Sequence, residues 1–98
     1  MSSFKLPTEK EITKDIRSFL KLRGICHYKQ WQGLGSEKGI PDIICIINGI
    51  YTAIEVKAPK GKLSEHQIKW QNRIEEAGGK YIVARSVLDV IRELNLES

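Results

Sequence analysis

The residue types with the clearest chemistry are two carboxylates and a lysine, Asp42, Glu55 and Lys57, which flank a predicted β-hairpin. Asn48-Gly49 stands between two isoleucine-rich runs, and this dipeptide indicates a type I′ turn because both central residues need a positive φ. Counting back from a two-residue loop places Asp42 opposite Glu55, with Cβ atoms roughly 4.5–5.5 Å apart. Lys57 projects from the same face of the sheet, because side chains alternate along a strand.

Two carboxylates held this close repel each other, which destabilises the fold unless a cation lies between them or one binds a proton. A divalent metal ion fits this position, since Mg²⁺ and Mn²⁺ take oxygen ligands and Mg²⁺ keeps several waters. Such an ion lowers the pKa of bound water and neutralises charge on a phosphate, and Lys57 can orient that water. The alternative is a pair of exposed charges at a strand end, which the apolar runs on both sides disfavour.

The sequence predicts an amphipathic helix before the hairpin. Thr8 and Glu11 have the spacing of a capping box, in which Thr8 caps the helix and Glu11 bonds back to the N–H of the cap. The helix is expected to run to about Arg23, because Gly24 provides a helix end. Its apolar stripe consists of Ile12, Ile16, Phe19 and Leu20.

A second helix is predicted after the hairpin, where Ser64 and Gln67 form another capping box. This helix is expected to bury Trp70 and Ile74 before Gly78-Gly79 ends it. Gln67 lies on nearly the same stripe as the two buried residues, so its side chain should point toward the sheet. A polar group placed there needs hydrogen-bond partners.

The remaining apolar segments complete the element order. Residues 25–30 and 80–84 are predicted strands, and Ser86 caps a final short helix. The order is therefore a helix, three strands, a helix, a strand and a helix. An antiparallel hairpin followed by a helix crossover predicts an α/β fold, with a mixed central sheet of about four strands flanked by helices.

The composition is that of one small domain, 1–98, with residues 1–7 as a flexible tail. The net charge of +4 favours a polyanionic partner. No run is apolar enough for a membrane span and no signal peptide is recognisable, so we expect a cytoplasmic protein with no membrane partner. Cys26 and Cys45 lack metal-ligand spacing and are expected to be reduced core residues.

Pro41-Asp42 and Glu55-Val56-Lys57, on the two sides of the hairpin, resemble the signature of the PD-(D/E)XK nuclease superfamily. The wider context is similar to its VRR-NUC branch, in the stand-alone form, from about Glu11 to Arg85. The resemblance implies a restriction-endonuclease-like core. The further residues that carry it are Gly39, Gly61-Lys62-Leu63-Ser64, Gln67 and Ala77-Gly78-Gly79.

The resemblance also implies a site for Mg²⁺ or Mn²⁺ and hydrolysis of phosphodiester bonds in DNA. Asp42 and Glu55 would be metal ligands, the main-chain carbonyl of Val56 would add a third, and Lys57 would position or activate water. The family places a glutamine beside the catalytic lysine, and Gln67 matches it.

The same resemblance implies a glutamate on the first helix that completes the acidic site and its metal ligands. Glu11 is the best match and Glu9 is the less favoured one. The capping box alone also explains a glutamate at position 11, so both readings of Glu11 stay open.

Basic and aromatic residues around the hairpin are candidate DNA contacts. An aromatic side chain with basic neighbours can stack on an unpaired base, and lysines after the catalytic strand can reach backbone phosphates. The alternatives are a partly buried anchor or subunit contact for Trp31, a solvated loop for the lysines and a surface charge for Arg85. The candidates are Lys29, Gln30, Trp31, Lys38, Lys60, Lys62 and Arg85.

The leading expectation is a metal-dependent, structure-specific DNA endonuclease of repair or recombination. A domain this small is expected to act as a homodimer, whose two-fold symmetry places two sites against a two-fold substrate. Stand-alone members of the family suggest branched DNA, such as a four-way (Holliday) junction. A flap- or nick-directed nuclease and a catalytically silent DNA-binding module are the alternatives. A site-specific, restriction-like enzyme would need a longer recognition insertion than this chain offers.

Overall fold

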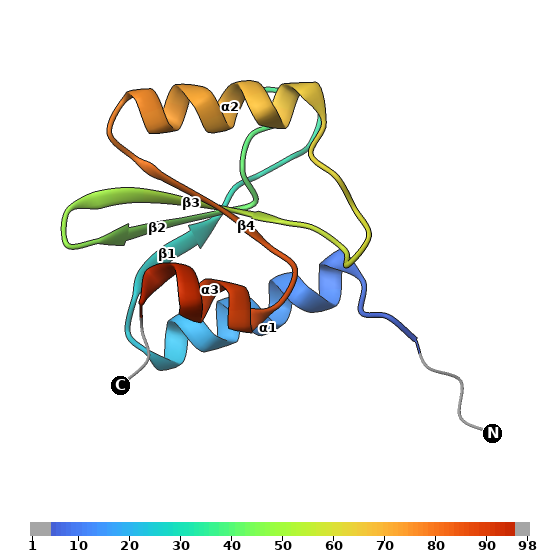
Figure 1. The fold of residues 1–98 in the computed structure, drawn as a ribbon, viewed down its shortest axis with the longest axis vertical. Helices are drawn as coiled ribbons and strands as arrows, with labels where there is room; N and C mark the ends of the chain where they lie inside the picture. Colours follow the sequence, from blue (N-terminus) through green and yellow to red (C-terminus); the bar gives the residue numbers. More distant parts are fainter. Residues whose placement is uncertain (1–4, 96–98) are drawn as a thin grey trace.

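The computed structural model describes residues 5–95 and has the element order that the sequence predicts (Figure 1). Residues 5–8 precede the first helix without regular structure, and residues 1–4 of the expected tail lie outside the described part. Within residues 5–95, no helix is long and apolar enough to cross a membrane. The elements are α1 (Glu9–Leu22), β1 (Cys26–Lys29), β2 (Ile43–Ile47), β3 (Ile50–Val56), α2 (Glu65–Glu76), β4 (Lys80–Ala84) and α3 (Val87–Leu94).

The four strands form one mixed sheet in the order β1-β2-β3-β4. The first three strands pair antiparallel, and β4 pairs parallel to β3 after the α2 crossover. Ile47 pairs with Ile50 across the turn, where Asn48 and Gly49 have φ values of 52° and 78°. The predicted hairpin register is therefore confirmed.

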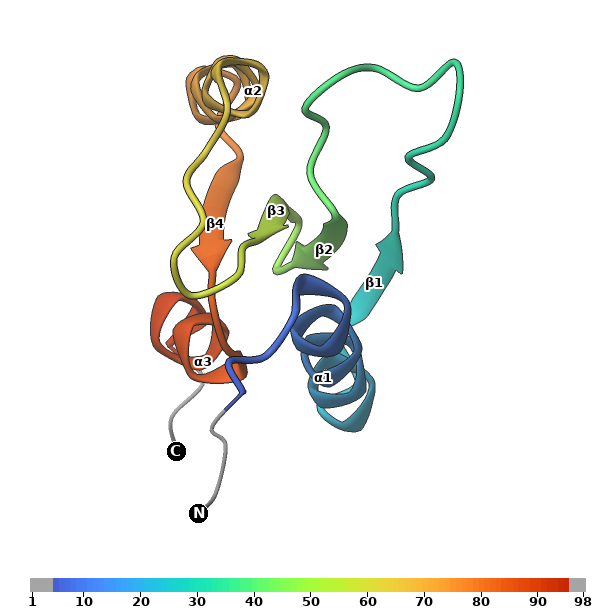
Figure 2. The same cartoon turned by 90° about the vertical axis from the view of Figure 1, so that its right-hand side faces the viewer.

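The helices cover both faces of this sheet, as Figures 1 and 2 show. Helices α1 and α3 lie together on one face, whereas α2 stands alone on the other (Figure 2). The first face buries a core built on Ile16, Leu20 and Ile54, and the second buries Ile44, Ala53 and Ile74. Both faces of the central hairpin are thus apolar, as a doubly covered sheet requires.

The helix ends follow their sequence signals closely. Both capping boxes are present, Thr8 with Glu11 and Ser64 with Gln67. The first helix ends at Leu22 with Arg23 as its C-cap, and Gly24 follows in the left-handed region at φ 67°. These caps fix where α1 and α2 begin, and both beginnings lie beside the carboxylates described below.

Two expectations about burial need correction. Cys45 is fully buried, but Cys26 is exposed, because β1 is an edge strand and Cys26 lies opposite Ile46, which is itself 43% exposed. Trp70 is only half-buried, whereas Ile74 on the same helix is 8% exposed. Trp70 lies at the margin of α2, where its indole N–H donates to the carbonyl of Lys38 at 3.1 Å.

Candidate active site

The two carboxylates of the hairpin come together where β2 begins and β3 ends. The backbone N–H of Gln30 donates to the carbonyl of Asp42 at 2.9 Å, which extends the pairing of β1 with β2 by one residue. The Oδ2 atom of Asp42 accepts the N–H of Val56 at 2.7 Å. This bond holds the Asp42 carboxylate against the end of β3, directly beside Glu55.

Glu55 is the buried member of the pair, with 2% of its surface exposed. Its Oε2 atom accepts a hydrogen bond from the Gln67 side chain at 3.1 Å, whereas its Oε1 atom is buried and accepts no hydrogen bond. Burial raises the pKa of Glu55 to about 9, the charge of Asp42 and a hydrogen bond between the two carboxyl groups add to the rise, and Lys57 opposes it. A metal-free Glu55 is therefore protonated at neutral pH.

Gln67 connects the second helix to this carboxyl. Its Oε1 atom accepts the N–H of Ser64 at 2.8 Å in the capping box, which leaves its amide N–H groups free for Glu55. One side chain thus helps cap the start of α2 and holds the Glu55 carboxyl. The expectation that Gln67 points toward the sheet is confirmed.

Lys57 follows β3 and is half-buried. Its N–H donates to the carbonyl of Ala84 at 3.0 Å, so the pairing of β3 with β4 continues through this residue. The side chain lies on the same side of the strand as Glu55, and its charge lowers the pKa of that carboxyl. Lys57 is thus fixed beside the carboxylates by the sheet itself.

The first helix brings Glu9, and not Glu11, to the carboxylates. Glu11 accepts from the N–H of Thr8 at 2.9 Å and from its hydroxyl at 3.1 Å, and these bonds lower the pKa of Glu11. Glu9 lines the hollow that also contains Asp42 and Glu55, and its charge contributes to the raised pKa of Glu55. The capping box therefore accounts for Glu11, and Glu9 is the helix glutamate that faces the site.

This hollow, which we call the site hollow, has a volume of about 570 Å³. The loop before β2 forms its outer wall and is pinned to α2 by the bond between Trp70 and Lys38. Gly39 has φ 78°, and a Cβ there would lie 2.5 Å from the main-chain carbon of His66. Only glycine allows this approach. The site hollow is lined by Glu9, Gln32, Gly33, Leu34, Gly35, Ser36, Glu37, Lys38, Gly39, Ile40, Asp42, Glu55, Ser64, His66 and Gln67.

The donor set fits a hard divalent cation held by few protein ligands. Within residues 5–95, no group of three or more His, Cys, Asp or Glu side chains is clustered as a metal site. The buried Oε1 of Glu55 and the neighbouring Asp42 carboxylate supply oxygen ligands, and the bond to Val56 brings its main chain close. Mg²⁺ is commonly held by one or two carboxylates with waters in its other positions.

The expected DNA contacts lie in different places. Lys38 lines the site hollow, whereas Trp31 is 66% exposed on the loop before it. Lys60 and Lys62 are exposed on the turn after β3. The guanidinium of Arg85 donates to the carbonyl of Gly61 at 2.8 Å, so this arginine holds the turn that carries the two lysines.

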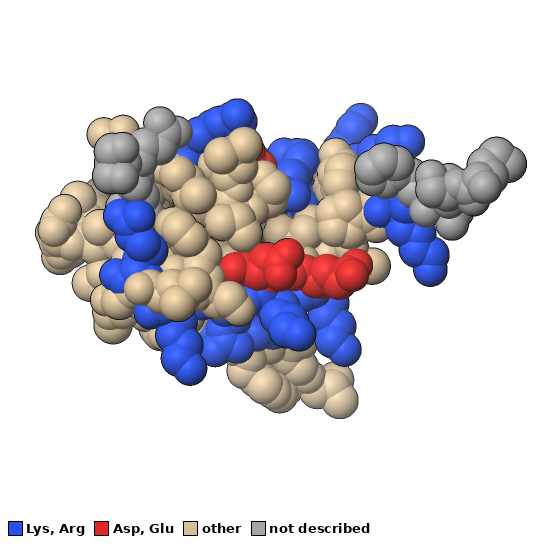
Figure 3. Space-filling model, turned by 90° about the horizontal axis from the view of Figure 1, so that it is seen from below, with Lys and Arg blue, Asp and Glu red and all other residues tan. Residues whose placement is uncertain are grey.

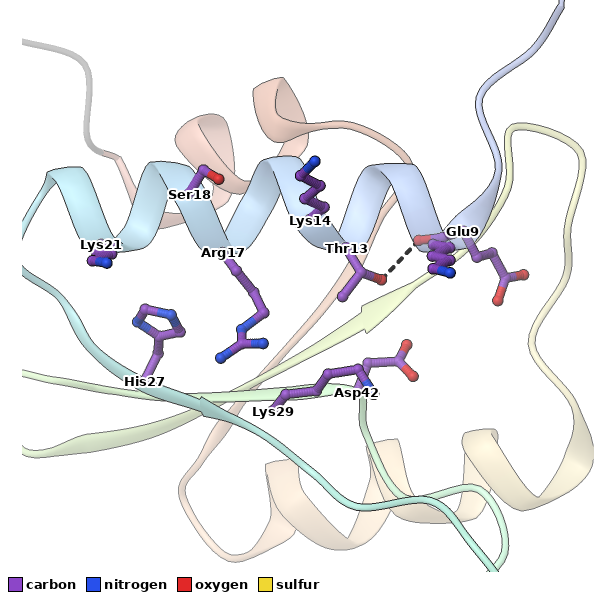
Figure 4. Close-up of a pocket in the computed structure, with 10 residues that line it drawn as sticks. Glu9, Thr13, Lys14, Arg17, Ser18, Lys21, His27, Lys29 and Asp42 are labelled. Atoms are coloured by element: carbon purple, nitrogen blue, oxygen red, sulfur yellow. Dashed lines mark hydrogen bonds between the residues drawn. The ribbon is translucent and has the colours of Figure 1, made fainter.

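A second hollow, of about 670 Å³, was not predicted and lies between α1 and β1 (Figure 4). We call it the basic groove, because cations dominate its lining. Four of them recur on α1 at spacings of four, three and four residues, which places them on one helix face. This repeat of basic residues in the sequence of α1 is the signal from which a basic helix face could have been predicted. Its lining residues are Glu9, Lys10, Thr13, Lys14, Arg17, Ser18, Lys21, His27, Lys29 and Asp42.

Comparisons with known proteins agree with this fold. A solved structure described as "VRR_NUC domain protein" is 18% identical, covers 93% of this chain and 88% of its own, and superposes with a TM-score of 0.77. A second, described as "VRR_NUC domain", is 22% identical, covers 94% of this chain and 100% of its own, and gives 0.74. No curated protein matched.

The family assignment comes from the sequence. The VRR-NUC domain model matches residues 4–88, which include both capping boxes, the hairpin carboxylates and Lys57. Because this match spans most of the 98 residues, the chain belongs to the VRR-NUC domain family, a family of nuclease domains.

Proposed function

We propose that the chain is an Mg²⁺- or Mn²⁺-dependent endonuclease that hydrolyses phosphodiester bonds in DNA. The observation that carries this proposal is the buried Glu55, whose carboxyl lies against that of Asp42 and keeps a proton at neutral pH when no metal is bound. Burying a carboxyl group beside a second carboxylate costs folding free energy, so such a pair is expected only where it binds a ligand. A divalent cation removes that cost, because it can take the place of the proton between the two carboxyl groups and offset both negative charges.

The roles of the residues follow from their places. Asp42 and Glu55 would hold the ion, with the main-chain carbonyl of Val56 as a further ligand. When bound, the ion would polarise a phosphate oxygen and lower the pKa of a water. The Lys57 ammonium would orient the attacking water and offset the negative charge that builds on the phosphate oxygens.

Two residues would support this constellation. Gln67 holds the orientation of Glu55 through its amide, so the carboxyl cannot rotate away when the ion arrives. Glu9 faces the same hollow and would bind a metal-bound water or the ion itself. We propose this role for Glu9 in place of Glu11, whose carboxylate is engaged by Thr8.

We further propose a homodimer that acts on branched DNA, such as a four-way junction in repair or recombination. Support comes from the sheet face that α2 covers only beside β3 and β4 (Figure 2). Tyr28, Ile46 and Tyr51 share this face by their register and are 51%, 43% and 40% exposed. Exposed apolar patches of this kind mark interaction surfaces, and a second copy would cover them.

A catalytically silent DNA-binding module is the alternative function. Such a module would not need a buried carboxyl beside a second one, and here both carboxylates and Lys57 are present. The alternative becomes the better account if the protein retains labelled DNA but never cuts it.

Cleavage of a panel of labelled DNAs tests the proposal. The panel contains single-stranded, duplex, flap, nicked and four-way junction DNA, each incubated with Mg²⁺, Mn²⁺ or EDTA. We expect cutting with either metal, none with EDTA and none by Asp42→Asn, which keeps an oxygen for the N–H of Val56. Equal cutting in EDTA would contradict the metal site, and a preference for unbranched duplex would contradict the branched substrate.

A further inference from the structure

We propose that the basic groove holds the phosphate backbone of the DNA strand on one side of the cleaved bond. This inference rests on the proposed function, because it takes the position of the reacting phosphate from Asp42 and Glu55. It adds a path for the substrate that the motif residues do not indicate, and of the expected DNA contacts only Lys29 lies on it. The path runs along α1, away from the carboxylates.

The first argument is the continuity of the two hollows. Glu9 and Asp42 line both the site hollow and the basic groove, so the groove opens directly onto the carboxylates. Figure 4 shows Glu9 and Asp42 together at one end of the groove and Lys21 with His27 at the other. A strand with its reacting phosphate at Asp42 would thus continue between α1 and β1.

The second argument is the charge of the groove. Cations come from both walls, with Arg17 extending from α1 toward β1, which contributes Lys29 (Figure 4). Like charges gathered around one hollow repel each other, which a polyanion relieves. Apart from Glu9 and Asp42 at the site end, no carboxylate belongs to the groove lining within the described residues.

The third argument is that charge on α1 is segregated by helix face. Glu11 and Asp15 are four residues apart and form one stripe, whereas the basic residues form another. Figure 3, which looks onto the side of α1 and α3, shows lysines and arginines along one edge of a row of acidic residues. A helix face that served only to keep the protein soluble would be expected to carry positive and negative side chains interspersed.

The fourth argument is length. From Lys10 to Lys21 the helix rises about 16 Å at 1.5 Å per residue. Measured along the axis of a B-form duplex, this length corresponds to about five base-pair steps at 3.4 Å each. The groove can therefore contact several successive phosphates, as a backbone track requires, and its open edge along β1 leaves room for the rest of the DNA.

The experiment is equilibrium binding of a fluorescent four-way junction in EDTA, so that no cleavage occurs, at several salt concentrations. The variants are Arg17→Gln, Lys29→Gln and the double substitution. Arg17→Lys keeps the charge in the groove. Arg92→Gln is the matched control, because Arg92 is exposed on α3 and this substitution removes one positive charge outside the groove.

Each neutralising substitution in the groove should weaken binding about four- to six-fold at 0.15 M salt and lower the salt slope by about 0.7–0.9. Arg17→Lys and Arg92→Gln should stay within two-fold of the native protein. Unfolding midpoints should not change, since both groove residues are exposed. The groove proposal would be overturned if the double variant kept the DNA affinity and salt slope of the native protein. It would also be overturned if Arg92→Gln lost as much affinity as the groove variants.

The same proteins separate this inference from the proposed function. If metal-dependent cutting occurs but the double variant binds and cuts like the native protein, the groove proposal fails and the nuclease stands. If the native protein never cuts but the double variant loses affinity, the nuclease proposal fails and the groove stands as a DNA-binding surface.

Discussion

The side-chain amide of Gln67 lies between the first turn of α2 and the buried carboxyl of Glu55, bonded to Ser64 at 2.8 Å and to Glu55 at 3.1 Å. Helix capping and site geometry therefore depend on one side chain. Any change that moves the start of α2 also moves the only side-chain donor that holds Glu55 within the described residues.

Gln67→Ala should remove both bonds at once. The second oxygen of Glu55 would lose its donor, and an unsatisfied buried group costs about 1–3 kcal/mol of folding free energy. We expect urea unfolding in EDTA to show that loss and cleavage to fall at least ten-fold. Gln71→Ala, one turn further along α2, is the control and should leave both nearly unchanged. Native cleavage by Gln67→Ala would mean that Glu55 needs no positioning.

The stability of the metal-free protein should fall as the pH rises, because of Glu55. Its pKa is about 9 in the folded state against 4.5 for a free glutamate side chain, so the native state binds this proton more tightly. The stabilisation is complete below pH 4.5 and is lost as the pH rises toward 9, at no more than about 1.4 kcal/mol per unit. Urea unfolding in EDTA measures it.

Glu55→Gln is the matched variant for this titration. Its amide carbonyl can still accept from Gln67, and it carries no proton to lose. Its stability in EDTA should therefore exceed that of the native protein at pH 8, with a weaker pH dependence. Added Mn²⁺ should stabilise the native protein and not the variant. Parallel pH profiles for the two proteins would show that Glu55 does not titrate in this way.

Gly39→Ala should damage the site hollow through the backbone. A Cβ at this position would lie 2.5 Å from the main-chain carbon of His66 and 2.8 Å from the nitrogen of Gln67. Gly35→Ala is a close control, because Gly35 has a similar positive φ of 89° and no atom within 4 Å of the added Cβ. Backbone strain is thus alike in the two variants.

We expect the midpoint of thermal unfolding and the cleavage rate to fall much further for Gly39→Ala than for Gly35→Ala. Equal losses would indicate that the positive φ alone matters and that the contact with α2 has no part in the site.

Glu9→Gln and Glu11→Gln should differ in their effect on cleavage. Glutamine at position 11 can still accept from the N–H of Thr8, so that variant should keep both its stability and its activity. Glu9→Gln should cut at least ten-fold more slowly while its unfolding midpoint stays native, because Glu9 lines the hollow that contains Asp42 and Glu55. Rates of junction cleavage for the two variants decide the assignment, and the opposite order would return the role to Glu11.

Local signals in the sequence were enough to predict the hairpin and the helix starts. Asn48-Gly49 determined the register, so the approach of Asp42 to Glu55 followed by counting along the strands. The capping boxes likewise placed Gln67 on the first turn of α2. Each of these features depends on residues only a few positions apart in the chain.

Features that depend on distant contacts were missed or left open. The choice between Glu9 and Glu11 depends on which helix face meets the end of β3, and the exposure of Cys26 depends on β1 being an edge strand. The basic groove needs α1 and β1 side by side, which the sequence of neither element specifies. Periodicity indicates a helix face, but the partner of that face comes only from the tertiary structure.

The central claim is that Asp42 and Glu55 hold a divalent ion and Lys57 promotes the attack of water. The most direct measurement is single-turnover cleavage of a labelled junction by the native protein and by Lys57→Ala, alongside a Mn²⁺ titration of both by calorimetry. We predict metal-dependent cleavage by the native protein, a loss of at least a hundred-fold in Lys57→Ala and similar Mn²⁺ affinities. Native cleavage rates in Lys57→Ala, or no cleavage by the native protein with either metal, would contradict the claim.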